Sequence, residues 1–207
     1  MSSEDRQSHW QNVYTTRGEK EVSWFQERPD VSVEFIVATG AGPDSAIVDI
    51  GGGASRLVDA LLDDGYRSLT VLDLSEAALA SSRERIGRRA ATVTWIAADI
   101  TTWRPPQRYD VWHDRAAFHF LTDEKDKRAY LSRMEAALRV GGQAIIATFA
   151  LDGPERCSGL PVARYDGASL AALFGPHFRL LANRVVEHRT PSGAAQVFQF
   201  SRFAFGH

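Results

Sequence analysis

The chain has few of the features that mark secreted, metal-dependent or membrane-spanning proteins. Its 207 residues include a single cysteine, Cys157, which excludes an internal disulfide and favours a reducing cytosol. Without companion cysteines Cys157 is not expected to hold a metal ion, and we predict no metal site. No apolar run approaches the roughly 18 residues that span a bilayer, and the first residues lack the cationic and apolar stretches of a signal peptide. The sequence therefore predicts a cytoplasmic protein without a membrane partner.

A large charge of one sign is also missing. The formal net charge is −2 and there is no basic arm, so we expect no nucleic-acid partner. Hydrophobic residues make up 44% and charged residues 24% of the chain, as in ordinary globular proteins. The length fits one domain over 1–207, with an N-terminal lid or helical segment over about 1–45 and a core over about 46–207.

From residue 46 onward, short apolar runs alternate with amphipathic segments. The runs predict strands near 46–50, 69–73, 92–97, 109–113 and 143–149. The amphipathic segments predict helices near 55–64, 76–86, 123–138 and 167–174. Such alternation is typical of an α/β fold with a mostly parallel sheet. Two further strand-like runs, 178–188 and 195–205, are joined by a Pro-Ser-Gly turn and predict an antiparallel hairpin at the C-terminus.

The N-terminal segment is rich in aromatic residues. We expect residues 9–26 to form a short helix and a loop, and the first eight polar residues to be mobile. A second helix is predicted to start at Pro29, with Asp30 as its N-cap, and Thr122 is predicted to cap the helix over 123–138.

A run of three glycines is the strongest signal for a ligand. The apolar run that ends at Ile50 is followed directly by Gly51, Gly52 and Gly53, a backbone bare enough for close approach of a ligand. The next apolar run ends at Asp73, about twenty residues on, where a carboxylate can accept hydrogen bonds from both hydroxyls of a ribose. Together they predict a cofactor that contains a nucleoside.

The glycine spacing argues against a dinucleotide. Arg56 stands where the G-x-G-x-x-G fingerprint has its third glycine, and the chain has no G-x-x-x-x-G-K-[ST] phosphate loop. Asp49, just before the glycines, disfavours an anion and suits an ammonium-bearing ligand. S-adenosyl-L-methionine, which has an adenosine, a sulfonium and an amino-acid tail, fits these requirements.

Four motifs in this order resemble those of the class I S-adenosylmethionine-dependent methyltransferases. They lie at residues 48–53, 71–75, 97–100 and 138–146, and the last has Val140 where the usual L-[KR]-P-G-G motif has proline. The resemblance implies a three-layer, Rossmann-like sandwich with a seven-stranded sheet, whose last strand inserts antiparallel between the fifth and sixth. It also implies S-adenosyl-L-methionine as the cofactor and S-adenosyl-L-homocysteine as the product.

The resemblance assigns cofactor contacts to the residues that follow the strands. Asp73 would hold the ribose, Asp99 would accept from the adenine amino group, and Asp49 would face the ammonium. The complete set of predicted cofactor-binding residues is Asp49, Gly51, Gly53, Asp73, Leu74, Asp99, Ile100 and, from the lid, Trp24. Each has a structural alternative, since the glycines can form a tight connection and both Asp73 and Asp99 can cap helices. Ser75 is another candidate cap and would free Asp73 for a ligand.

Polar residues are concentrated over 109–120, after the fourth predicted strand. Residues 114–116 (D-R-A) resemble the D-R-G of thiopurine-type methyltransferases and the D-K-G of several protein-lysine methyltransferases, with Ala116 departing from both. As catalytic candidates, Asp114 would orient or deprotonate the acceptor, Arg115 would bind the cofactor carboxylate or an acidic acceptor, and His119 would act as a general base. The alternatives are an Asp114–Arg115 ion pair at a helix start and a core histidine. His113, within the strand, is interpreted as structural.

Two segments are predicted to line the acceptor pocket. Trp10 and Tyr14 belong to an aromatic lid resembling that of both branches, or they anchor the N-terminal helix to the core. The long loop over 152–165 adds Cys157, Arg164 and Tyr165, with Cys157 as pocket wall rather than nucleophile.

The sequence leaves three hypotheses for function. The first is methyl transfer by direct in-line displacement to a heteroatom of a small molecule, with a thiol favoured. The second is a protein-lysine N-methyltransferase, and the third is a non-catalytic S-adenosylmethionine-binding protein. The N-P-P-[YF] motif of base-methylating enzymes is absent, which disfavours nucleic-acid methylation.

Overall fold

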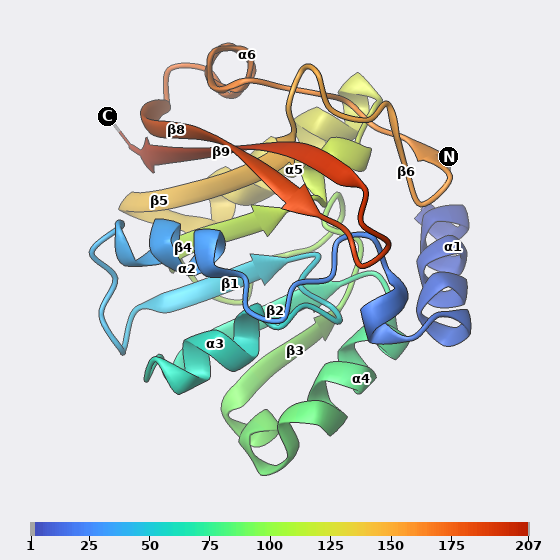
Figure 1. Ribbon diagram of the computed structural model, residues 1–207. Coiled ribbons are helices and arrows are strands. Elements are labelled where there is room, and N and C mark those ends of the chain that lie inside the picture. The colour runs from blue at the N-terminus through green and yellow to red at the C-terminus, as the bar shows by residue number, and fades with distance from the viewer. Residues whose placement is uncertain (1–2, 207) are drawn as a thin grey trace.

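The computed structural model describes residues 3–206, which are built around a twisted seven-stranded sheet (Figure 1). The strands run in the order β3-β2-β1-β4-β5-β9-β8. Their bounds are Ala46–Ile50 (β1), Ser68–Asp73 (β2), Val93–Ala97 (β3), Tyr109–Arg115 (β4), Leu138–Phe149 (β5), Phe178–Arg189 (β8) and Ala195–Phe205 (β9). Strands β1 to β5 are parallel, and β9 lies antiparallel between β5 and β8. The predicted fold and the inserted last strand are confirmed.

Helices cover both faces of the sheet and complete three layers. They are α1 (Ser3–Thr16), α2 (Asp30–Val37), α3 (Leu57–Asp63), α4 (Glu76–Ile86), α5 (Glu124–Ala137) and α6 (Gly167–Phe174), with short 3₁₀ turns η1 (Glu19–Glu21), η2 (Gly87–Thr92) and η3 (Phe118–Phe120). A two-residue hairpin, β6 (Arg156–Cys157) and β7 (Leu160–Pro161), stands apart from the main sheet. Among residues 3–206, no helix is both long and apolar enough to cross a membrane.

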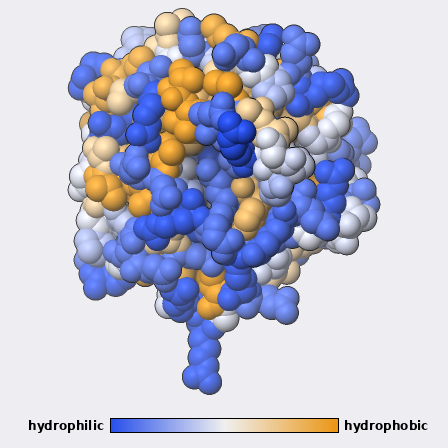
Figure 2. Space-filling view, in the orientation of Figure 1, coloured by the Kyte–Doolittle hydropathy of each residue, from blue (hydrophilic) through white to orange (hydrophobic). Residues whose placement is uncertain are grey.

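Alternation along the strands divides the core into two clusters. On β1, Ile47 packs with side chains of α2, α3 and α4, while Val48 and Ile50 pack with side chains of α5 and α6. Both faces of the central strands are therefore buried, which explains why their sequences read as continuous apolar runs. The face seen in Figure 2 is mostly hydrophilic, with hydrophobic residues in scattered patches.

The N-terminal segment is more ordered than its sequence indicates. The prediction that the first residues are mobile is wrong for 3–8, which form the first turns of α1; residues 1 and 2 lie outside the described part. Arg6 forms ion pairs with Asp99 and Asp126, and the side-chain oxygen of Gln11 accepts hydrogen bonds at the start of α4. These contacts with distant segments hold α1, and local composition does not reveal them.

Three other local predictions are wrong. Asp30 is the first residue of α2 rather than its N-cap, which is Pro29. Asp123, not Thr122, precedes α5, and no side chain there makes a capping hydrogen bond. Strand β4 continues to Arg115, because pairing with β5 extends to the Arg115–Ala147 pair.

Candidate active site

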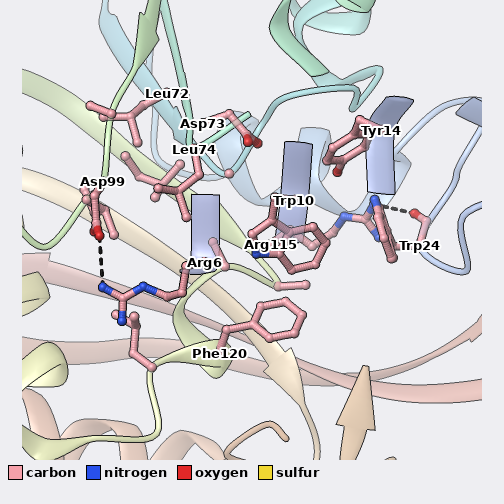
Figure 3. A pocket seen from close by; sticks show the side chains of 17 residues that line it. Arg6, Trp10, Tyr14, Trp24, Leu72, Asp73, Leu74, Asp99, Arg115 and Phe120 are labelled. Carbon is pink, nitrogen blue, oxygen red and sulfur yellow. Dashed lines mark hydrogen bonds and ion pairs between the residues drawn. The ribbon is translucent and has the colours of Figure 1, made fainter. Parts of the chain in front are cut away.

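A pocket lies where β1, β2 and β4 end, beneath α1 and the loop that follows it (Figure 3). Ligands of open α/β sheets bind at this edge, where the strand order changes direction between β1 and β4. Of the predicted cofactor-binding residues, the pocket brings together Gly51, Asp73, Leu74, Asp99, Ile100 and Trp24. Asp49 and Gly53 lie just behind this wall.

Two of the three glycines are required by carboxylates packed against them, and Gly51 is required by its φ of 68° and by the Ala117 side chain. A Cβ on Gly52 would stand 2.3 Å from Oδ2 of Asp49, and one on Gly53 would stand 2.5 Å from Oδ2 of Asp73. Real Cβ atoms do not approach other atoms so closely, so any side chain would displace these acids. The loop is also tied to β2, since the Gly51 N–H donates to the Leu72 carbonyl at 2.7 Å. The glycine run therefore fits tightly between Asp49 and Asp73, with its backbone facing the pocket.

Asp73 is a buried carboxylate at the pocket wall. It is 6% exposed, and its Oδ1 accepts a hydrogen bond from the Ser75 N–H at 2.8 Å. Burial raises its pKa to about 7, the negative charge of Asp49 adds to this effect, and backbone N–H groups oppose it. The Ser75 hydroxyl accepts from the Ala78 N–H and caps α4, so Asp73 is not the cap of this helix.

Asp99 is already engaged by protein donors. Its Oδ1 accepts from the N–H and hydroxyl of Thr101, and its Oδ2 lies 2.9 Å from an Arg6 nitrogen and accepts from the Ser3 hydroxyl. Burial opposes ionisation, but these hydrogen bonds prevail and lower the pKa of Asp99 to about 2. Asp99 is thus both the cap of a turn and part of the pocket, and Arg6 is a pocket residue that the sequence analysis missed.

Arg115 places a positive charge inside the pocket. Its guanidinium donates to the Trp24 carbonyl at 2.7 Å (Figure 3). Within residues 3–206 it forms no ion pair with a carboxylate, so the predicted alternative of an Asp114–Arg115 pair is wrong. Burial lowers the pKa of Arg115 to about 10, and the nearby charge of Asp49 acts in the opposite direction. The pocket therefore contains a desolvated cation that forms no ion pair within residues 3–206, although the charge of Asp49 acts on it.

Asp114 points away from the pocket. Its carboxylate is fully buried and accepts hydrogen bonds from the N–H groups of Ala117 and Phe118 and from the Tyr130 hydroxyl, at 2.7 to 3.1 Å. The Tyr130 hydroxyl in turn accepts from Trp112 Nε1 at 2.8 Å. Burial raises the pKa of Asp114 to about 6. The structure thus places Asp114 behind the turn that forms the pocket wall, so a direct contact with an acceptor would need rearrangement of this turn.

His119 is also buried outside the pocket lining. Its ring packs against Phe120 and Phe149, and Nδ1 accepts a long hydrogen bond of 3.4 Å from the Phe149 N–H. Burial lowers its pKa to about 3, so the imidazole is neutral near pH 7. In this position it matches the core-histidine alternative and not a solvent-linked general base.

The loop over 152–165 does not reach the pocket in this structure. Cys157 is buried in the core, where desolvation raises its pKa to about 11. Arg164 pairs with Glu155 at 3.0 Å, and Tyr165 packs on the ring of Phe118. None of the three predicted loop residues lines the pocket, although Cys157 lies close enough to Tyr14 for its charge to contribute to the raised pKa of that hydroxyl.

The aromatic lid both lines the pocket and anchors α1. The Trp10 ring lies 4.9 Å from Phe120 and 5.7 Å from Trp24, and Tyr14 lies 6.2 Å from Trp24, all measured between ring centroids. These four side chains surround the pocket beside Arg115 (Figure 3). Trp10 and Tyr14 therefore line the pocket and also pack α1 against the core, and their contact with an acceptor stays a prediction. Phe120 is a further pocket residue that the sequence analysis did not select.

Ala116, where the related motifs have glycine, carries backbone strain. Its φ of 70° lies in the left-handed region, which costs a residue with a Cβ about 1–2 kcal/mol. We expect Ala116→Gly to raise the free energy of unfolding by about 0.5–1 kcal/mol after the extra chain entropy of glycine is subtracted. Urea titration measures this. Ala117→Gly is the control, since φ is −99° there and the substitution should destabilise the protein; equal losses for both variants would contradict the strain.

Comparison with known proteins agrees with the fold and the motifs. Residues 47–142 match the methyltransferase domain family. The chain is 28% identical over 147 residues to the eEF1A lysine and N-terminal methyltransferase of Danio rerio, covering 69% of this chain and 21% of that protein. It is 28% identical over 130 residues to thiocyanate methyltransferase 1 of Arabidopsis thaliana, covering 61% of this chain and 56% of that one.

A solved structure shows the same architecture. The 1,6-didemethyltoxoflavin-N1-methyltransferase of Burkholderia thailandensis, with bound S-adenosylhomocysteine, superimposes with a TM-score of 0.72 at 20% identity, over 100% of this chain and 92% of that one. Residues 47–142 thus match a methyltransferase domain, and the motif set and the fold resemble those of the class I S-adenosylmethionine-dependent methyltransferases. The chain spans about a fifth of the length of the eEF1A methyltransferases that it matches.

Proposed function

We propose that this chain transfers a methyl group from S-adenosylmethionine to a heteroatom of a small molecule, with a thiol or a similarly soft acceptor favoured. The observation that carries the choice of acceptor is Arg115, a desolvated guanidinium in an aromatic pocket that forms no ion pair with a carboxylate of residues 3–206, although the charge of Asp49 acts on it. Such a charge stabilises a bound anion and repels an ammonium group.

The residues present fit the cofactor. Asp73 offers a carboxylate to the ribose hydroxyls, Leu74 and Ile100 offer apolar surface to the adenine, and Gly51 offers bare backbone to the amino-acid tail. Asp99 would accept from the adenine amino group if Arg6 released part of its carboxylate. When bound, the cofactor supplies an electrophilic methyl carbon to an aligned nucleophile.

The chain's own residues then align the acceptor rather than deprotonate it. Burial raises the pKa of the Tyr14 hydroxyl far above neutrality, so it stays protonated and acts as a donor. His119 is packed in the core. A thiol suits such a pocket, because a few per cent is already thiolate near neutral pH and a guanidinium favours that form. The rings of Trp10 and Trp24 exclude water around it.

Protein lysine is the second candidate acceptor. It is supported by the names of the eEF1A relatives, although their match covers only a fifth of those proteins. A lysine would have to pass the aromatic lid and lose its proton beside Arg115. The names of these relatives favour a lysine acceptor, whereas the positive charge of Arg115 disfavours one. An experiment can distinguish the two.

The test is an acceptor panel of small thiols, amines and intact cell protein, each with wild-type enzyme. We expect methylated small thiols, and for Arg115→Met a kcat/KM lower by about 10- to 100-fold, with affinity for S-adenosylhomocysteine changed less. Arg115→Lys should recover part of this loss. The control is Arg67→Met, which removes a surface arginine that pairs with Asp44 and should leave kcat/KM as in wild type. Methylation of protein lysine without thiols would establish the second candidate. Cofactor binding without turnover on any acceptor would favour a non-catalytic binding protein.

A further inference from the structure

Three polar residues form a hydrogen-bonded chain in the core beneath the glycine loop. His113 of β4 lies beside its sheet partner Asp49 of β1, with 2.7 Å between Nδ1 and Asp49 Oδ1. Its other ring nitrogen, Nε2, is 3.0 Å from the hydroxyl of Ser32 on α2. Ser32, His113 and Asp49 are 1%, 2% and 5% exposed, so this chain is closed to solvent.

The Asp49 carboxylate fixes a hydrogen on Nδ1 of His113, whereas the Ser32 hydroxyl at Nε2 can either donate or accept. A carboxylate oxygen only accepts hydrogen bonds, so Nδ1–H donates to Asp49, and Nε2 can accept from the Ser32 hydroxyl. The imidazole is thereby held at both ends. Since Asp49 Oδ1 is occupied by this bond, the other oxygen, Oδ2, is turned toward Gly52.

Polar groups at this position need an explanation, because central parallel strands are usually apolar on both faces. Burying them costs free energy that hydrogen bonds only offset. The negative charge of Asp49 acts on two residues of the pocket wall. It raises the pKa of Asp73, and it also raises the pKa of Arg115, against the effect of burial. Asp49 thus acts on the pocket through the loop without lining it.

We propose that His113, itself held by Ser32, is a positioning residue that fixes the Asp49 carboxylate beneath the glycine loop, where its charge attracts the ammonium group of the cofactor's amino-acid tail. The inference rests on the proposed function only in that the cofactor binds along this loop. It gives a positioning role to His113 and a supporting role to Ser32, and neither residue lines the pocket.

The test compares two ligands by calorimetry on the same protein. One is S-adenosylhomocysteine, and the other is the analogue that lacks only its α-amino group. For wild type we expect the first to bind more tightly by at least about tenfold, the scale of a charge pair near a protein surface. His113→Leu should shrink this ratio toward that of Asp49→Asn. His113→Asn, whose amide can still donate to Asp49, should restore much of it, and Ser32→Ala should have an intermediate effect.

Because each ratio is taken within one protein, a general loss of stability cancels. Equal weakening of both ligands in His113→Leu, or no change, would overturn the positioning role while leaving the cofactor assignment intact. If wild type binds neither ligand, the proposed function and this inference both fail. Should His113→Leu not fold, ring-nitrogen NMR of wild type decides: the His113 signal should have the Nδ1-protonated pattern and move with S-adenosylhomocysteine more than with the deaminated analogue. Equal shifts with both ligands would contradict the proposal.

Discussion

Asp73→Ala is expected to weaken binding of S-adenosylhomocysteine by about 1–3 kcal/mol, or roughly 5- to 150-fold, the scale of lost hydrogen bonds to a charged group. The side chain stands at the end of β2 in a nearly dry position, where no water replaces the missing acceptor well. Calorimetric titration at pH 8 measures the effect, with Asp63→Ala as a surface control on α3. Unchanged affinity of Asp73→Ala would sink the ribose assignment.

The raised pKa of Asp73 adds a pH signature. Burial raises this pKa from 3.8 to about 7, so below pH 7 the carboxyl of the ligand-free protein is mainly protonated. Because the folded protein holds this proton more tightly than the unfolded chain, the protonated carboxyl contributes to folding stability. The contribution is fully present below about pH 4 and is lost as the pH rises through 7. Ribose hydroxyls bind better to the ionised form. Affinity should therefore rise from pH 6 to pH 8, and Asp73→Asn, which has no proton to lose, should flatten that rise. The same slope in both proteins would point to another titrating group.

Asp114→Ala is expected to lower the free energy of unfolding by about 3–5 kcal/mol, because a buried carboxylate with three donors is replaced by a methyl group. The N–H groups of Ala117 and Phe118 and the Tyr130 hydroxyl would lose their acceptor together. Urea titration gives the value.

Two milder variants separate this structural role from chemistry. Asp114→Asn keeps an acceptor for the N–H groups, and Tyr130→Phe removes one donor and leaves Trp112 Nε1 without its acceptor. Both should lose less stability than Asp114→Ala. If Asp114→Asn folds as well as wild type yet loses turnover with unchanged cofactor affinity, the carboxylate acts on the acceptor after all.

The order and type of the core elements could be predicted because parallel strands buried on both faces leave a plain signal, an apolar run that ends in glycine or acid. The end of β4 was misjudged for the same reason: residues 114 and 115 are charged, yet pairing with β5 keeps them in the strand. Helix α1 starts early because Arg6 and Gln11 meet partners far along the chain, and such contacts have no local signature.

The nucleoside side of the pocket could be predicted from the sequence better than the acceptor side. The residues proposed to bind the nucleoside follow directly from the strand ends, because topology alone brings those ends to one edge of the sheet. The residues proposed for the acceptor depend on how turns and loops pack. At the end of β4, Asp114 is buried behind the turn while Arg115 lines the pocket, His119 is buried in the turn itself, and no residue of the loop over 152–165 lines the pocket. Charge in the sequence does not tell which side of such a turn a residue faces. Arg6 could have been suspected only from its place on one face of a helix with Trp10.

The insertion of β9 between β5 and β8 sets an order for assembly of the chain. Strand β8 leaves the ribosome first but pairs with the sheet solely through β9 within the described residues, so it has no docking edge until β9 has been made. Because β9 also pairs with β5, the edge of β5 stays unpaired until β9 has been synthesised. Completion of this sheet is therefore a long-range event, and the edge through which partly folded chains aggregate closes only when β9 pairs with β5.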